Sequence, residues 1–235
     1  MLDVLRQEII NTADGEKGKI LQRFFKTGKG DYGEGDIFCG LTVPQSRSIA
    51  KKYHELPLTD TVTLLHAKIH EERLIALLIL IIKFQKGDES DKQAIYETYL
   101  KNTRYINNWD LVDLSADKIV GAYLKDHDRK ILLDLAHSKD IWERRISMVS
   151  TYQFIRDLKE YKDTFAVADI LLQDNHDLIQ KAVGWMLREV GKRVSREKEE
   201  EFLLTRYQKM PRTMLRYAIE HFPEEKRKKY LAGEV

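Results

Sequence analysis

Helix-breaking residues are almost absent from the middle of this chain, and their absence limits the folds open to it. Proline occurs only at positions 44, 57, 211 and 223, and glycine is concentrated in the first 40 residues. Between residues 58 and 210, apolar side chains recur three and four positions apart, without strand-like alternation. Because proline and glycine interrupt helices, their scarcity predicts that this stretch is helical.

Short polar clusters divide the helical stretch into pieces of roughly 10 to 18 residues. They contain glycine, asparagine, aspartate or serine, the residues that cap or end helices. The clusters are Gly87–Asp88, Asn102–Thr103, Asp126–Asp128, Ser138–Asp140, Asp157, Asp174–Asn175 and Gly191–Ser195. Short helices joined by short links are typical of helical hairpins rather than of long bundle helices.

An internal repeat gives these hairpins an order. Windows placed 36 residues apart align HEERLIAL, INNWDLVD, WERRISMV and LIQKAVGW without gaps. Their fourth column holds Arg73, Trp109, Arg145 and Lys181, and the later columns are mostly apolar. Stacked helix pairs of this period form HEAT-like solenoids. We therefore predict an all-α fold, an α-α superhelix of HEAT-like repeats with a concave groove, in a single domain over residues 1–235.

The overall charge excludes two classes of protein. The chain has 40 Lys and Arg against 38 Asp and Glu, a formal net charge of +2. Neither a disordered polyelectrolyte nor a uniformly basic nucleic-acid binder fits this balance. Residues 181–235 nevertheless carry 14 basic and 9 acidic side chains. A solenoid can turn basic residues such as Lys181 toward one groove, so a local phosphate-binding face is compatible with the balance.

Three features bear on the cellular compartment. The single Cys39 excludes an intrachain disulfide and suits a reducing environment. The N-terminal sequence MLDVLRQEII places charges where a signal peptide would be apolar. The longest apolar run, Leu74–Ile82, is far shorter than the roughly 20 residues that span a bilayer. We expect a soluble cytoplasmic protein without membrane contact.

A glycine-rich string near the N-terminus matches a dinucleotide fingerprint only in its letters. Gly28, Gly30 and Gly33 have the required spacing, but the preceding segment is predicted to be a helix rather than a strand. Nearby acidic residues such as Asp31 would also repel a pyrophosphate. We predict a mobile loop at about residues 28–36 and no cofactor.

Two histidines have the spacing of metal ligands on a helix. His66 and His70 stand at i, i+4, but the zinc-protease pattern requires glutamate directly after the first histidine, and Ala67 stands there. We expect histidines on the surface or at the rim of the core, and no metal.

The segment NNWDLVD is different because it combines an indole with a carboxylate. Trp109 and Asp113 are i, i+4 neighbours and would project from one helix face. They can be a functional pair. They can equally be a core tryptophan and an aspartate near the helix start, since Asn107 or Asn108 begins the helix.

The repeat register adds two residues to this pair. Trp185 occupies the same repeat position as Asp113, and Arg145 shares the column of Trp109. If the register holds, all four side chains share the concave face. Two indoles, a carboxylate and a guanidinium suit a cationic aromatic or sugar-like ligand close to a phosphate.

Several segments together resemble one known family. FCGLTVPQSR, NNWDLVD, IWERR and QKAVGWMLRE follow one another over nearly the whole chain. In this the chain resembles the AlkD-like DNA alkylation repair enzymes, a HEAT-like repeat family of DNA glycosylases. The resemblance implies monofunctional hydrolysis of the N-glycosidic bond of cationic purines, chiefly 3-methyladenine and 7-methylguanine, in base excision repair. It also implies excision without flipping the base into a pocket.

Roles for single residues follow from the resemblance. The family's essential tryptophan and aspartate fall on Trp109 and Asp113, which implies that these two are catalytic. Its arginine falls on Arg145 and its second tryptophan on Trp185, which implies contacts with the DNA. Arg188 matches a basic position that implies phosphate contact.

The chain also departs from the family prototype. It carries the Gly-rich insert, and an aromatic residue and a glutamine that contact DNA in the prototype correspond here to Phe24 or Phe25 and to Thr42. We expect double-stranded DNA with alkylated bases as the partner of a monomer, and Lys181 among the DNA-binding residues. The alternative is a non-catalytic HEAT-like solenoid that binds a DNA structure or a protein partner.

Overall fold

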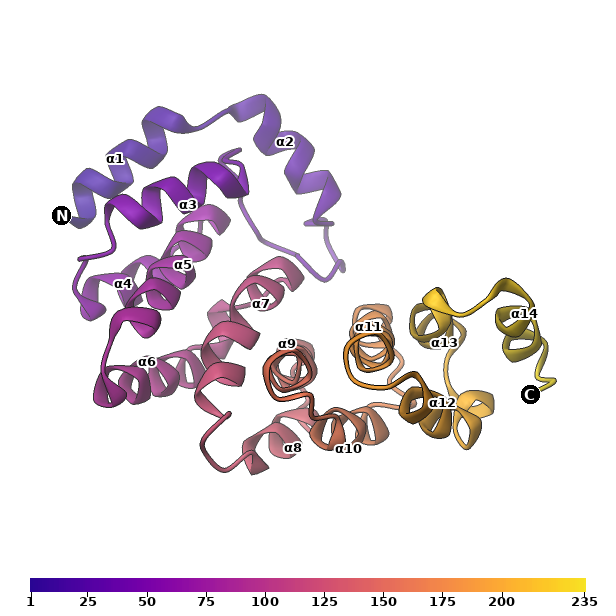
Figure 1. Ribbon diagram of the computed structural model, residues 1–235. Coiled ribbons are helices and arrows are strands. Elements are labelled where there is room, and N and C mark those ends of the chain that lie inside the picture. Colours follow the sequence, from indigo (N-terminus) through magenta and orange to yellow (C-terminus); the bar gives the residue numbers. More distant parts are fainter. The chain divides into compact units, whose positions relative to one another are not determined.

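The computed structural model describes residues 1–235 as fourteen α-helices joined by loops and by short 3-10 and π-helical turns (Figure 1). It contains no β-strand, and a single bridge joins Ile37 to Ile69. No helix combines the length and the apolar character needed to cross a membrane. The predicted all-α fold is confirmed. The helices form two compact units, Met1–Ser115 and Ala116–Val235.

Helix α5 is the centre of the first unit. It packs against α3, α4 and α6, and its apolar stretch from Leu74 to Ile81 is buried. A helix that is apolar around its whole circumference must be enclosed by other elements. The helices of this unit are α1 (Leu2–Thr12), α2 (Gly15–Phe24), α3 (Val43–Lys52), α4 (Leu58–Leu65), α5 (His70–Lys86), α6 (Glu89–Lys101) and α7 (Trp109–Ala116), whose last residue is the first of the second unit.

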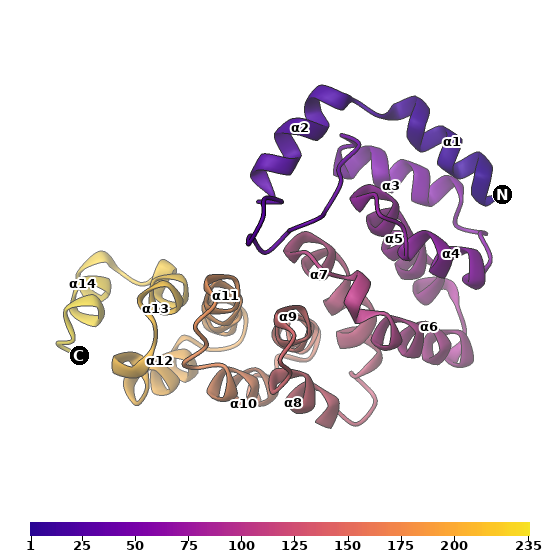
Figure 2. The same cartoon turned by 180° about the vertical axis from the view of Figure 1, so that it is seen from behind.

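The second unit is a stack of helix pairs. In both views α9, α11 and α13 lie in one row and α8, α10 and α12 in another (Figure 2). Within the first row α11 packs against α9 and α13, and across the rows α8 packs against α9. Such stacking is typical of helical repeat proteins. The helices are α8 (Lys130–Ala136), α9 (Ile141–Ser150), α10 (Lys162–Ile170), α11 (Asp177–Arg193), α12 (Arg196–Leu204), α13 (Arg212–Ala218) and α14 (Glu224–Ala232).

The predicted helix ends agree with the structure at most of the polar clusters. Helix α5 ends at Gly87, and the Ser195 side chain caps α12. Gly191 is an exception, because α11 continues to Arg193. A Cβ atom at Gly191 would lie 1.7 Å from Glu199 Oε2, so this glycine makes room for α12 instead of ending its own helix.

The gapless 36-residue register is wrong at α7. The four helices that carry the repeat column begin at residues 70, 109, 141 and 177. Arg145 and Lys181 are therefore each the fifth residue of a helix, whereas Trp109 is the first residue of α7. The physical reason is the 3-10 turn Thr103–Tyr105 and the residues after it, which lengthen the connection before α7.

The segment between α2 and α3 is a loop, which includes residues 28–36, and its second half is packed into the interior of the first unit. The mobility expected for residues 28–36 stays a prediction. Asp36 and Phe38 are buried. Gly40 has φ +94°, and a Cβ atom there would lie 2.0 Å from the Asp14 carbonyl oxygen. Only glycine permits this approach, which holds the end of the loop against the start of α2.

Candidate functional site

A cavity of about 490 Å³ in the first unit contains both members of the predicted catalytic pair. Trp109 and Asp113 lie one turn apart on α7 and both line it. The rest of the lining comes from α2, the following loop, α3 and α5, and it is mainly apolar, with further carboxylates from Glu71 and Asp110. The structure thus places an indole and a carboxylate beside each other in the mainly apolar lining of one cavity.

The start of α7 is fixed by the residue before it. Asn108 is completely buried, and its Oδ1 accepts a hydrogen bond from the Trp109 backbone N–H at 2.9 Å. Its Nδ2 donates to Asp36 Oδ2 at 2.9 Å. The prediction that Asn107 or Asn108 begins this helix is confirmed for Asn108, which also ties α7 to the loop.

Aromatic rings extend from Trp109 into the core. Phe25 stacks on Trp109 with centroids 5.1 Å apart, and Phe24 meets the same indole edge-on at 6.1 Å. Phe25 in turn stacks on Phe38 at 4.8 Å, and Phe38 on the His70 imidazole at 4.3 Å. The Phe24 side chain is 62% exposed, so the stack runs from the surface to the buried histidine.

A buried cluster of charges lies behind these rings. His70 Nδ1 is 3.1 Å from Asp36 Oδ2, and His70 Nε2 is 2.8 Å from Asp110 Oδ2. Arg73 Nη2 also donates to Asp36, and its Nη1 donates to the Ala67 carbonyl oxygen at 3.2 Å. His70 is only 1% exposed. The cluster joins the loop, α5 and α7.

The charges in the cluster set one another's ionisation. Burial alone would lower the pKa of His70, but the charges and hydrogen bonds of Asp110 and Asp36 outweigh it and raise the pKa to about 9. Burial alone would raise the pKa of Asp36, yet the bonds and charges of His70 and Arg73 hold it below its ordinary value. At neutral pH the imidazolium therefore faces ionised aspartate.

The sequence-based expectation for the two histidines was wrong in two respects. His66 and His70 do not share a helix, because α4 ends at Leu65 and α5 begins at His70. His70 is buried rather than at the rim, since two aspartates neutralise it. His66 is exposed, pairs with Asn102 Oδ1 at 2.6 Å and stacks on Tyr105. The missed signal is the charged HEER string directly before the apolar run of α5.

Glu71 organises the end of the loop. Its carboxylate accepts hydrogen bonds from the backbone N–H groups of Cys39, Gly40 and Leu41 at 3.0, 2.8 and 3.1 Å. Burial and this neighbouring carboxylate raise the pKa of the Cys39 thiol to about 12. The cysteine is thus a protonated thiol at neutral pH and unsuited to nucleophilic catalysis.

The other predicted site residues lie in the second unit, on the neighbouring helices α9 and α11. Arg145 is 5% exposed, and its Nη1 donates to the Leu178 carbonyl oxygen, which ties α9 to the start of α11. Lys181 pairs with Asp177 at 2.9 Å, and Arg188 with Glu220. DNA contact by these residues stays a prediction.

Trp185 lies on the same helix as Lys181 and Arg188. Its ring is partly buried, with Tyr152 at 6.2 Å between centroids. The structure therefore brings Arg145, Lys181, Trp185 and Arg188 onto one helix pair of the second unit, while Trp109 and Asp113 belong to the first unit.

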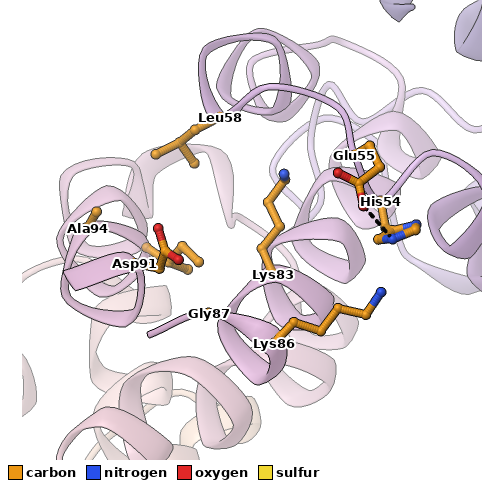
Figure 3. Close-up of a pocket in the computed structure, with 9 residues that line it drawn as sticks. His54, Glu55, Leu58, Lys83, Lys86, Gly87, Asp91 and Ala94 are labelled. Carbon is orange, nitrogen blue, oxygen red and sulfur yellow. Dashed lines mark ion pairs between the residues drawn. The ribbon is translucent and has the colours of Figure 1, made fainter. Parts of the chain in front are cut away.

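A second pocket in the first unit, of about 270 Å³, contains none of the predicted residues. Lys83 and Lys86 extend from α5 beside His54 and Glu55, and Asp91 lines the α6 side (Figure 3). His54 Nε2 lies 2.8 Å from Glu55 Oε1. Two lysines and two carboxylates balance each other, so this pocket has no net charge to attract phosphate.

A comparison with protein-family models decides the assignment of the chain. The model described as "DNA alkylation repair enzyme" matches residues 5–222. The chain belongs to the DNA alkylation repair enzyme family.

A solved structure supports the fold of this family member. It is described as "Predicted DNA alkylation repair enzyme from Enterococcus faecalis" and superimposes with a TM-score of 0.69. The match covers 91% of this chain and 98% of the other at 16% identity, so it concerns the fold alone. A comparison with curated proteins gives no match.

For a DNA alkylation repair enzyme, the cavity beside α7 is the candidate active site. It combines a carboxylate and an indole with a mainly apolar lining and few polar groups, as substrate sites do. The predicted residues of the second unit do not include a carboxylate beside an indole. Its predicted cations Arg145, Lys181 and Arg188 are bonded to other groups of the protein.

Proposed function

We propose that this DNA alkylation repair enzyme is a monofunctional DNA glycosylase that excises cationic alkylated purines, such as 3-methyladenine and 7-methylguanine, from duplex DNA. The observation that carries the proposal is the placement of Asp113 and Trp109 one helical turn apart in the lining of one cavity. The repair family supplies the context of alkylated DNA.

The chemistry requires little acid catalysis from the protein. An alkylated purine carries a positive charge, so it leaves as a neutral base with the electron pair of the N-glycosidic bond. The difficult species is the deoxyribose, which becomes oxocarbenium-like as that bond breaks. A fixed carboxylate and the electron-rich face of an indole stabilise this developing charge. Asp113 and Trp109 are the residues that supply them.

Water completes the reaction. Its oxygen forms the new bond to the sugar carbon from which the purine has departed, and one of its protons must leave. Asp113 can orient this water and accept the proton. The mainly apolar lining around Asp113 limits the number of competing solvent molecules.

The second unit contributes binding in this proposal. Lys181 and Arg188 exchange their ion pairs with Asp177 and Glu220 for DNA phosphates, and Trp185 contacts the backbone sugar. Arg145 is nearly buried, and its bond to the Leu178 carbonyl oxygen holds α11 in place for these contacts. Phosphate contacts of this kind make affinity fall with rising salt concentration.

The direct test is incubation of the protein with methylated genomic DNA and chromatography of the supernatant. The proposal predicts free 3-methyladenine or 7-methylguanine, with an abasic site left in the duplex and no strand cleavage by the protein. Binding to DNA without release of any methylpurine would instead indicate a non-catalytic binding protein and would overturn the proposal.

A further inference from the structure

Trp109 is flanked on both sides by residues of the buried charge cluster. Asn108, directly before it, donates to Asp36 at 2.9 Å. Asp110, directly after it, pairs with His70 at 2.8 Å, and His70 pairs with Asp36 at 3.1 Å. The chain from Asn108 to Asp110 and the side chains of Asp36 and His70 thus form a closed ring around the first residue of α7.

His70 is the one member of this ring that needs two protons. Its nitrogens face two different carboxylates, and an ionised carboxylate only accepts hydrogen bonds. With both carboxylates ionised, both nitrogens donate, and the imidazolium closes the ring. The imidazole also stacks on Phe38 at 4.3 Å and lies 5.4 Å from Phe25, which fixes its plane.

Helix α7 depends on outside contacts at its beginning. Trp109 and Asp110 belong to its first turn, and the helical backbone continues without a break into the π-helical turn Asp117–Gly121. The first backbone N–H groups of a helix have no partner within the helix, so side chains around them determine how the first turn is held. Asp113 stands one turn further on, so a shift of the first turn moves the indole and the carboxylate in the cavity together.

We propose that His70 is a positioning residue, which holds the first turn of α7 through Asp110 and thereby sets the placement of Trp109 and Asp113 in the cavity. The effect on catalysis rests on the proposed glycosylase function, whereas the effect on Trp109 does not. No contact of His70 with substrate is required.

Two substitutions separate the two bonds of His70. Glutamine places its amide nitrogen near the position of Nε2, so His70→Gln keeps a donor for Asp110. Asparagine places its amide nitrogen near the position of Nδ1, so His70→Asn keeps a donor for Asp36 and loses Asp110. The matched control is His66→Gln, four residues earlier, where the side chain is exposed and outside the cluster.

The experiment compares three readouts in the full-length variants. The first is the single-turnover rate of 7-methylguanine release at saturating duplex. The second is the indole ¹H–¹⁵N signal of Trp109 in DNA-free protein, which is assigned by its loss in Trp109→Phe. The third is the midpoint of thermal unfolding. We expect His70→Asn to release base about tenfold to a hundredfold more slowly and to shift the indole signal, since displacement by about 1 Å can cost a hundredfold. His70→Gln stays within about threefold of the wild-type rate, and His66→Gln matches the wild type in all three readouts.

Several results would overturn the inference. One is that the Gln and Asn variants lose the same amount of rate and that this loss parallels the fall of their thermal midpoints. Such a result would mean that His70 has a merely structural role. Another is a wild-type rate and an unshifted Trp109 signal in His70→Asn. If the wild-type protein releases no methylpurine, the proposed function fails, but the indole signals of the Gln and Asn variants still decide whether His70 positions α7.

Discussion

Two buried titratable groups, one in each unit of the protein, are stabilised in different ways. In the first unit the imidazolium of His70 lies between the carboxylates of Asp36 and Asp110. In the second unit Glu199 is completely buried, and its Oε2 accepts a hydrogen bond from Arg196 at 3.0 Å while Oε1 has no partner. Burial raises the pKa of Glu199 to about 8, so this acid is mostly neutral at pH 7.

Each unit also has a helix whose position depends on a particular contact. In the first unit the ion pair of His70 with Asp110 lies at the start of α7, and buried networks of opposite charges fix geometry. In the second unit α11 packs closely on α13, since a Cβ atom at Gly184 would lie 2.4 Å from the Met214 carbonyl oxygen. The candidate site thus borders a buried charge network, whereas α11 and α13 belong to a regular helix stack.

The two tryptophans give the largest expected contrast between the units. Trp109→Ala removes the indole from the cavity, and we expect the single-turnover rate to fall about 10²- to 10³-fold, the range for loss of one group that stabilises a developing charge. Trp185→Ala should mainly weaken duplex binding and leave the rate at saturating DNA within about threefold. Single-turnover kinetics with a DNA titration measure both. A larger rate loss in Trp185→Ala would reverse the roles assigned to the units.

The pH dependence of stability tests the buried charges directly. The pKa of His70 is about 9 in the folded protein, above its ordinary value of 6.5. The folded state therefore retains a proton that the unfolded chain loses, so this stabilisation is complete below pH 6.5 and declines as the pH rises to 9. At about 1.4 kcal/mol for each pKa unit, the decline is about 3 to 4 kcal/mol.

Urea unfolding between about pH 5 and about pH 10 measures this effect. His70→Gln should lack the decline that ends near pH 9. Glu199→Gln serves as the comparison. In the wild type, folding raises the pKa of Glu199 from 4.5 to about 8, so the free energy of unfolding declines between these two pH values. Glu199→Gln should lack this earlier decline. An unchanged pH profile in His70→Gln would contradict the buried imidazolium.

A glycine substitution tests the packing of the second unit. Gly184→Ala should lower the free energy of unfolding by about 1 to 3 kcal/mol, because the added methyl group meets the backbone of α13. Gly15→Ala is the control, since no atom lies within 4 Å of a Cβ there and alanine favours a helix. Denaturant unfolding of both variants measures the difference. Equal stabilities would show that α11 and α13 are not held at this distance.

The smallest expected effect concerns DNA affinity. Lys181→Gln removes one proposed phosphate contact and should reduce the slope of log K against log salt concentration by about 1, without a change in the rate at saturating DNA. Fluorescence anisotropy at several salt concentrations gives the slope. The control is Lys83→Gln in the second pocket, where two lysines and two carboxylates balance. Identical slopes for all three proteins would remove Lys181 from the proposed DNA contacts.

Local signals in the sequence predicted the helices well. Residues such as Asn108 and Ser195 cap the helix that follows them, and their chemistry is readable from the sequence alone. The π-helical segments Asp117–Gly121 and Phe154–Leu158 could not be predicted in this way, because an inserted residue in a helix leaves the apolar spacing nearly unchanged.

The candidate site could be predicted only in part. Helical spacing indicated that Trp109 and Asp113 share one helix face, whereas their catalytic role is implied by the family resemblance alone. The partners of His70 stand 34 and 40 residues away in the sequence, so no local pattern pairs them. The same limit applies to Arg145, whose burial depends on a carbonyl group of another helix 33 residues away.

In the proposed function Asp113 performs the chemistry, while other residues bind the duplex. The most direct measurement is the single-turnover release of 7-methylguanine from a methylated duplex by wild-type protein and by Asp113→Asn, with the affinity of each for the same duplex. We expect similar affinities and a rate at least about 10²-fold lower in the variant, since an amide neither accepts the proton nor carries the compensating charge. Equal rates in the two proteins, or no release by the wild type, would contradict the proposed function.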